Sequence, residues 1–280
     1  MGFTTAGIAA HRWRLSASEH LPVWSVQALN DARDSNNPMH DDTVARQLGF
    51  AGGLVPGVTL FGYLTRPFAA LFGDAFLNGA SMEIRFRRPV YEGTWVSTAI
   101  EVSDAQKDGA VFSASLLDEA GEACVLATVN MPEPNRRPQT LPPLRPLPAQ
   151  RRPATPESLR AEPVFGTLTG CVSLRDATAY TAMLGDDAMR YAGLVHPAWL
   201  LRQANLVVDR NLELGPWIHV GSEVSFLGPV RANEPWTARG EVLELRTHKG
   251  REYADLDIAI GGAAPALRVR HKVIYRMEAA

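Results

Sequence analysis

This sequence of 280 residues contains few cysteines and no long apolar runs, and its positive and negative charges nearly balance. Cys124 and Cys171 are its only cysteines and lie far apart, which argues against a disulfide framework and a cysteine zinc site. The net charge is only −2, so we expect no nucleic-acid partner. No run approaches the ~20 apolar residues of a membrane span, and residues 1–15 lack the apolar core of a signal peptide. We therefore expect a soluble cytoplasmic protein with no membrane partner.

The most distinctive pattern is a polar turn at residues 34–42, which reads Asp-Ser-Asn-Asn-Pro-Met-His-Asp-Asp. Pro38 restricts the preceding Asn37 to an extended conformation, and the carboxamides of Asn36 and Asn37 can bond the backbone of a tight turn. We therefore expect His40 to have a fixed orientation. Its imidazole can act as a base or an acid near neutral pH, although a structural histidine that bonds its own turn is an alternative interpretation.

A glycine-led apolar segment follows this turn. Asp41 or Asp42 can cap a short helix that Gly49 would end, and we interpret both aspartates as caps. Residues 58–72 are apolar on nearly every side, which is typical of a helix wrapped by other structure. The amide of Gly57 would then lie at the positive end of this helix, where it could donate to a carbonyl oxygen.

The segments after this helix predict an antiparallel meander. Alternating or β-rich runs occupy residues 82–87, 95–102, 111–117 and 123–131. One helix followed by such a meander indicates a domain of the α+β class. Pro67 should kink or restart the helix, and we expect residues 8–30 to hold one strand and a short helix that begins near Ser25.

Two strings in this order resemble the MaoC-like, or (R)-specific enoyl-CoA hydratase, family of hot-dog proteins. They are Asn37-Pro38-x-His40-x-Asp42, followed by Ala45, Gly49-Phe50 and Gly57, and Arg85-Phe86-Arg87-Arg88-Pro89-Val90-Tyr91-Glu92-Gly93. In that family the asparagine-proline-x-histidine turn carries the catalytic histidine. The resemblance implies that His40 is the acid or base and that the amide of Gly57 holds the carbonyl oxygen of an acyl thioester.

The aspartate of the family pattern has no direct counterpart in this sequence. It usually lies two positions before the asparagine, where this chain has Ser35. Asp34 lies one residue too early but could act if the turn holds an extra residue; alternatively, Ser35 and Asn36 position water. The catalytic candidates are His40, Asp34 and Gly57, the substrate-binding candidates are Asn37, Ser35 and Arg85, and we expect no metal site.

Ten of the 20 prolines lie at residues 132–163, which predicts an extended linker that joins neither a sheet nor a helix interior. The sequence on either side of it is repeated at an offset of 140 residues. The matches include Leu54 with Leu194, Val55 with Val195, Leu60 with Leu200, Glu83 with Glu223, Phe86 with Phe226 and Val90 with Val230. A constant offset over about fifty residues predicts two copies of one domain.

We therefore expect an α+β double hot-dog fold, with two tandem domains at residues 1–131 and 164–280 whose sheets join edge to edge. The C-terminal copy is predicted to have lost its site, because the same offset pairs His40 with Tyr180 and Gly57 with Pro197, which has no amide hydrogen. Its expected roles are to stabilise the first copy and to form one wall of the ligand channel.

The resemblance implies an acyl-thioester hydratase or dehydratase of fatty acid metabolism. Its substrate would be a 2-enoyl-CoA, a 3-hydroxyacyl-CoA or the acyl-carrier equivalent, no cofactor is implied, and double hot-dog chains could pair as a homodimer. Arg85, Arg87 and Arg88 could meet coenzyme A phosphates, although a solvated strand face explains them as well. An acyl-CoA thioesterase and a non-catalytic acyl-thioester-binding subunit remain as alternatives.

Overall fold

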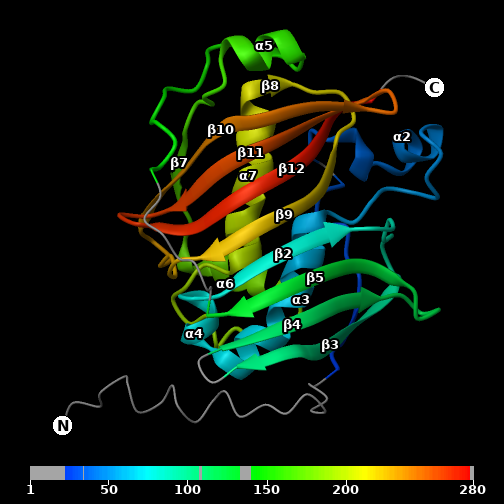
Figure 1. Ribbon diagram of the computed structural model, residues 1–280, viewed down its shortest axis with the longest axis vertical. Helices are drawn as coiled ribbons and strands as arrows, with labels where there is room; N and C mark the ends of the chain where they lie inside the picture. The colour runs from blue at the N-terminus through cyan, green and yellow to red at the C-terminus, as the bar shows by residue number, and fades with distance from the viewer. Residues whose placement is uncertain (1–22, 34, 107–108, 133–139, 278–280) are drawn as a thin grey trace.

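In the computed structural model, the described residues are 23–33, 35–106, 109–132 and 140–277. Ten strands of this part of the chain form one antiparallel sheet in the order β1-β3-β4-β5-β2-β9-β12-β11-β10-β7. Two long helices, α3 and α7, lie side by side against one face of this sheet (Figure 1). Each half of the sheet belongs to one half of the sequence.

The N-terminal half contributes five strands and four helical segments. They are β1 (Ser25–Gln27), η1 (Pro38–His40), α2 (Asp42–Gln47), α3 (Gly57–Phe72), α4 (Asp74–Leu77), β2 (Ser81–Phe86), β3 (Trp95–Gln106), β4 (Gly109–Leu117) and β5 (Ala123–Met131). The apolar segment that follows the polar turn therefore forms the central helix, and the meander follows it as predicted.

The C-terminal half repeats this order after the proline-rich connection. Its elements are β6 (Arg152–Pro153), α5 (Pro156–Ala161), β7 (Leu168–Cys171), α6 (Leu174–Met183), α7 (Pro197–Asn211), β8 (Leu212–Glu213), β9 (Ile218–Phe226), β10 (Pro235–His248), β11 (Arg251–Gly261) and β12 (Pro265–Met277). β6 and β8 pair separately in a small parallel sheet.

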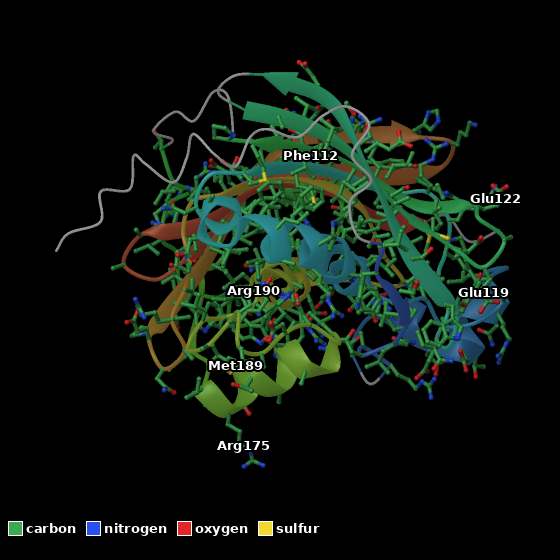
Figure 2. The ribbon with its side chains drawn as sticks, turned by 90° about the horizontal axis from the view of Figure 1, so that it is seen from below. Phe112, Glu119, Glu122, Arg175, Met189 and Arg190 are labelled. Carbon is green, nitrogen blue, oxygen red and sulfur yellow. The ribbon has the colours of Figure 1, made fainter. Side chains whose placement is uncertain are left out.

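The core lies between the sheet and the two long helices. Phe112 of β4 points toward α3 (Figure 2) and meets Phe68 edge to face, with 5.5 Å between ring centroids. On β2, Met82 and Ile84 are buried while Ser81, Glu83 and Arg85 lie on the other face, as the two-residue period of a strand requires. Because α3 is enclosed by the sheet and by α7, it is apolar on nearly every side.

The two halves are related by the 140-residue offset in their hydrogen bonds as well as in their sequence. Val55 N–H donates to the carbonyl of Val90 at 2.8 Å, and Val195 N–H donates to that of Val230 at 2.9 Å. β2 pairs with β9 so that Glu83 lies opposite Glu223, its own counterpart. An approximate two-fold axis therefore passes between these two residues, and the two half-sheets join edge to edge there.

Three local expectations differ from the structure. Ser25–Gln27 forms a strand against β3, and not the start of a helix, because its backbone pairs with the edge of the sheet. α3 continues through Pro67 without restarting. The described part of the proline-rich connection includes β6 and the six-residue α5, where Pro156 occupies the first turn, in which its missing N–H is not needed. None of the described helices is long and apolar enough to span a membrane.

Candidate active site

A cavity of about 250 Å³ lies where the two halves meet. The N-terminal half contributes the turn that carries His40, the start of α3 at Gly57 and the end of β2 at Phe86. The C-terminal half contributes Trp217 and His219 from around the start of β9, and Asn205 comes from α7. The cavity is therefore a shared feature of both halves, and the C-terminal half forms one of its walls.

His40 is held at the end of η1 by contacts to both its ring and its backbone. Its Nδ1 lies 2.7 Å from the carbonyl oxygen of Leu54, and Asn30 Nδ2 donates to the carbonyl of His40 at 2.9 Å. Gly53 passes so close that a Cβ at this position would lie 2.3 Å from the carbonyl oxygen of His40. The loop between α2 and α3 therefore fixes the orientation of the imidazole.

These contacts determine the protonation state of His40. A carbonyl oxygen can only accept, so Nδ1 carries the hydrogen and Nε2 keeps its lone pair. Burial lowers the pKa of His40 below its ordinary value, and the bond to Leu54 and the negative charge of Asp31 act in the opposite direction. Arg202 lowers the pKa further. The ring is therefore a neutral imidazole whose Nε2 is available as a base.

Asn37 positions this turn. Its Oδ1 accepts from Met39 N–H at 3.2 Å, which caps η1, and its Nδ2 donates to the carbonyl oxygen of Trp217 at 3.0 Å. The same Nδ2 lies 3.5 Å from His40 Nε2. Asn37 lines the cavity, but its carboxamide is occupied by protein contacts, so it links the turn that carries His40 to the C-terminal half.

Gly57 begins α3 in the wall of the same cavity. Amides in the first turn of a helix have no acceptor within the helix, and none of the described side chains caps this end. A Cβ on Gly57 would lie 2.8 Å from the ring of Phe86 and 3.0 Å from Nδ1 of His219. Glycine is therefore required here for packing, and the helix end remains available to a ligand oxygen.

A second cavity of about 320 Å³ lies beside the first. Ser35 lines it together with Asp209 and Arg202, and the Oγ of Ser35 accepts from Asn37 N–H at 3.4 Å. Four residues line both cavities, namely Asn37, His40, Asn205 and Trp217. His40 thus lies between a less polar cavity on the α3 side and a more polar one on the Ser35 side.

Asp34 lies outside the described residues. A nearby carboxylate that we did not predict is Asp31, which accepts from Thr59 Oγ1 of α3 at 2.6 Å and is paired with Arg202 of α7 at 2.7 Å. Its side chain is almost completely buried. Only the packing of three distant segments brings Asp31 close enough to influence His40, so no local pattern could have identified it.

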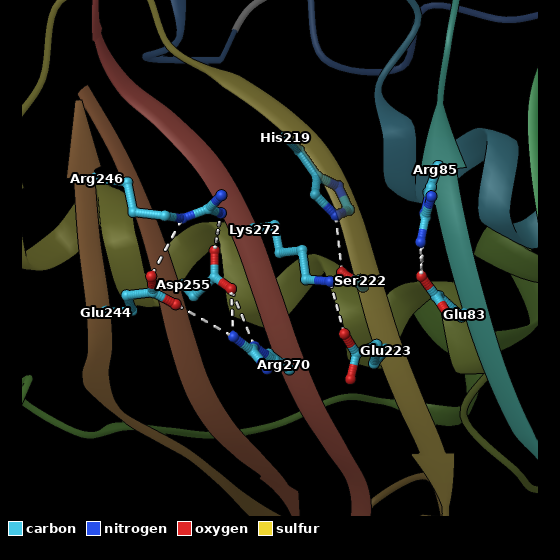
Figure 3. Close-up of polar contacts among 10 residues, drawn as sticks. All are labelled: Glu83, Arg85, His219, Ser222, Glu223, Glu244, Arg246, Asp255, Arg270 and Lys272. Carbon is cyan, nitrogen blue, oxygen red and sulfur yellow. Dashed lines mark hydrogen bonds and ion pairs between the residues drawn. The ribbon is translucent and has the colours of Figure 1, made fainter. Parts of the chain in front are cut away.

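Arg85 is separated from this site by the sheet. It lies on the outer face of β2, where its Nε donates to Glu83 at 3.0 Å (Figure 3). The substrate-binding role predicted for it therefore finds no support in its position. Arg87, Arg88 and Arg251 do line the cavity and are exposed at its mouth. Arg88 is paired with Glu122 at 2.8 Å.

The equivalent place in the C-terminal half is arranged differently. His196 caps α7 by accepting from Ala198 N–H at 3.0 Å, and its other ring nitrogen lies 3.1 Å from Asp186. Tyr180, the counterpart of His40, is buried. The first residue of α7 is Pro197, so this helix start has one amide fewer than that of α3.

Within the described residues, no group of three or more acidic, histidine or cysteine side chains is arranged to hold a metal ion.

Comparison with known proteins identifies the fold. No family model and no curated protein matches the sequence. A Chloroflexus aurantiacus protein named as a MaoC domain dehydratase matches with a TM-score of 0.62 and 11% identity, over 91% of this chain and 94% of that one. A Mycobacterium tuberculosis protein described as a double hot-dog matches with a TM-score of 0.60 and 14% identity, over 91% and 96% of the two chains.

A third solved structure belongs to a different activity class. It is a Novosphingobium aromaticivorans protein named as a thioesterase, which matches with a TM-score of 0.53 and 11% identity over 91% of this chain and 95% of that one. Identities this low establish the fold and not the reaction. The α+β double hot-dog prediction is confirmed, and the fold is the one found in MaoC-like proteins.

Proposed function

We propose that this protein with a MaoC-like double hot-dog fold catalyses the reversible addition of water to the β-carbon of a 2-enoyl thioester, carried by coenzyme A or an acyl-carrier protein. The observation that supports this most directly is the orientation of His40. Its Nδ1 is engaged by Leu54, and the ring lies in the same cavity as the amide end of α3. A base and a carbonyl-binding helix end within one cavity suit the chemistry of hydration.

The proposed reaction needs only one acid-base residue. The thioester carbonyl accepts a hydrogen bond from the amide of Gly57. His40 Nε2 takes a proton from water while the water oxygen bonds to the β-carbon, and the electrons of the double bond move to the carbonyl oxygen as an enolate. The imidazolium then returns the proton to the α-carbon, which restores the carbonyl. Because His40 serves in both steps, the absence of an aspartate at position 35 does not prevent the reaction.

Other residues around His40 support this assignment. The negative charge of Asp31 favours the imidazolium that forms during the reaction. Asn205 Oδ1 and Trp217 Nε1 are buried and have no hydrogen-bond partner in the described structure. One is an acceptor and the other a donor, and both residues line both cavities. They are suited to hold a water molecule or a β-hydroxyl group beside Nε2.

The mouth of the cavity suits a thioester of coenzyme A. Arg87 and Arg251 place positive charges there, beside Arg88 in its ion pair with Glu122, where the phosphates of the carrier would lie while its acyl group enters toward Gly57. Of the three arginines that the sequence suggests for the carrier phosphates, Arg87 and Arg88 line the cavity and Arg85 does not, and the C-terminal half adds Arg251.

A thioesterase is the second candidate, because a solved thioesterase shares the fold. Its water would be directed by a carboxylate, and among the described residues the available one is Asp209 in the second cavity, where Asn36 donates to it at 3.2 Å. No carboxylate of the described residues lines the cavity that contains Gly57. The position of the carbonyl-binding helix end therefore favours hydration over hydrolysis.

The test is to mix the protein with short and medium 2-enoyl-CoA esters and to follow the loss of the conjugated enoyl absorbance. His40→Gln should lower kcat by at least ~100-fold, the usual contribution of a general base. His248→Gln is the matched control, since this histidine is exposed at the end of β10. Release of free thiol from saturated acyl-CoA would instead indicate a thioesterase. Binding without turnover of either substrate would indicate a non-catalytic subunit and would overturn the proposal.

A further inference from the structure

His219 brings a second imidazole into the cavity from the C-terminal half. It lies near the start of β9, is only 7% exposed and lines the cavity together with His40 and Gly57. Its Nδ1 is buried and has no hydrogen-bond partner among the described atoms. A Cβ on Gly57 would lie 3.0 Å from this nitrogen. The unpartnered atom therefore lies next to the helix end that would receive a carbonyl oxygen.

The other side of the ring is anchored in a hydrogen-bond chain. His219 Nε2 lies 2.8 Å from Ser222 Oγ (Figure 3), and Ser222 Oγ lies 3.1 Å from Nδ1 of His271 on β12. His271 is fully buried, and its Nε2 has no partner either. Burial lowers the pKa of His219 to about 3, against an opposing effect of the Gly221 backbone, and lowers that of His271 as well. Both rings are therefore neutral.

Two arrangements of the hydrogens satisfy this chain. If His219 donates to Ser222 and Ser222 donates to His271, the unused N–H is on Nε2 of His271, a residue that does not line the cavity. If His271 donates to Ser222 and Ser222 donates to His219, the unused N–H is Nδ1 of His219. A buried donor without an acceptor is unfavourable. Only the second arrangement places it where a molecule in the cavity can accept the hydrogen bond.

We propose that Nδ1–H of His219 is a second donor to the carbonyl oxygen of the bound acyl thioester, beside the amide of Gly57. Ser222 and His271 hold the ring in place and accommodate this tautomer. The inference rests on the proposed function in one respect, namely that this cavity binds an acyl thioester. It gives the C-terminal half a direct part in the site, because a donor aimed at the oxygen that gains negative charge stabilises the enolate.

Infrared spectroscopy of a bound substrate analogue tests this contact directly. The probe is butyryl-CoA labelled with ¹³C at the carbonyl carbon, which is saturated and therefore cannot be hydrated. Two donors should shift the carbonyl band of the bound thioester to a lower frequency than that of the free thioester. His219→Leu should abolish most of this shift, whereas His219→Asn should retain much of it, because the amide nitrogen of asparagine occupies nearly the position of Nδ1.

The same variants separate this inference from the proposed reaction. With enoyl-CoA substrates, His219→Leu should lower kcat by about 100-fold, the usual effect of losing one such donor, and His219→Asn should restore part of it. A His219-dependent band shift without enoyl turnover would refute the hydratase and retain the carbonyl contact. Enoyl turnover with an unchanged band and kcat in His219→Leu would refute the contact alone. If the carbonyl band of butyryl-CoA bound to the wild-type protein lies at the frequency of the free thioester, the His219 contact is refuted as well.

Discussion

The pKa of His40 is set first by burial and the hydrogen bond to Leu54, and then by the charges of one ion pair. Asp31 raises its pKa, Arg202 lowers it, and these two residues are paired with each other at 2.7 Å. Burial is the largest effect and lowers the pKa below 6.5. A base must be neutral to act, so the acid limb of the kcat/KM profile should lie below pH 6.5, and activity should not change through neutral pH as His40 does not titrate there.

Two substitutions should move this limb in opposite directions. Asp31→Asn removes the charge that favours the imidazolium, so the limb should shift to lower pH. Arg202→Gln removes the charge that disfavours it, so the limb should shift to higher pH. The measurement is kcat/KM for enoyl-CoA hydration as a function of pH in the three proteins. A limb that stays in place in both variants would show that His40 is not the base.

At the same scale, the structure brings some of the predicted residues to the cavity and leaves others away from it, for definite reasons. His40, Gly57 and Asn37 were recognisable because a local turn and a helix start determine their positions. Arg85 does not line the cavity, because Phe86 points toward it and the neighbouring residue in the strand must point away. Asn205, Trp217 and His219 could not be found, because they reach His40 only through the packing of the two halves.

Among the elements, the starts of α3 and α7 show how the same helix position was adapted in two ways. α3 begins with Gly57, packed against the ring of Phe86, whereas α7 begins with Pro197 behind the buried ring of His196. Glycine leaves an open helix end at α3, and the buried histidine side chain caps the end of α7. A larger residue at position 57 must displace Phe86 or His219.

Gly57→Ala should therefore destabilise the protein by about 1–3 kcal/mol, as overpacking of a tight contact usually does. Gly215→Ala is the matched control, since a Cβ there would meet no atom within 4 Å. Phe86→Leu in the Gly57→Ala background should recover part of the loss by removing the ring that the new methyl group meets at 2.8 Å. Urea unfolding of the four proteins measures these changes, and equal stability of the two alanine variants would contradict the packing argument.

The elements themselves were largely predictable, with errors where pairing overrides local preference. The apolar segment 58–72 and the four β-rich runs appear as α3 and β2 to β5. Residues 25–27 became an edge strand because β3 offers them backbone partners. The repeat was the strongest predictor, since its offset recurs in the Val55–Val90 and Val195–Val230 hydrogen bonds.

At the scale of the whole molecule, buried and half-buried histidines lie near the junction of the halves. His40 and His219 line the shared cavity, and His271 is linked to His219 through Ser222. His196 caps the start of α7, which corresponds to the start of α3 in the N-terminal half. Burial lowers the pKa of all four below 6.5. In the unfolded chain they would titrate near that value, so the unfolded state binds more protons at acid pH.

The sign of the effect on stability follows from this difference. Above pH 6.5 both states hold these rings neutral, and the free energy of unfolding should not change on their account. Below it, each buried histidine should remove up to ~1.4 kcal/mol of stability per pH unit until its folded pKa is reached. Urea unfolding between about pH 7.5 and 5 should show this fall, in a range above that in which most carboxylates titrate. His271→Asn should lower the slope by one such contribution, and an unchanged slope would show that His271 is already protonated in the folded protein.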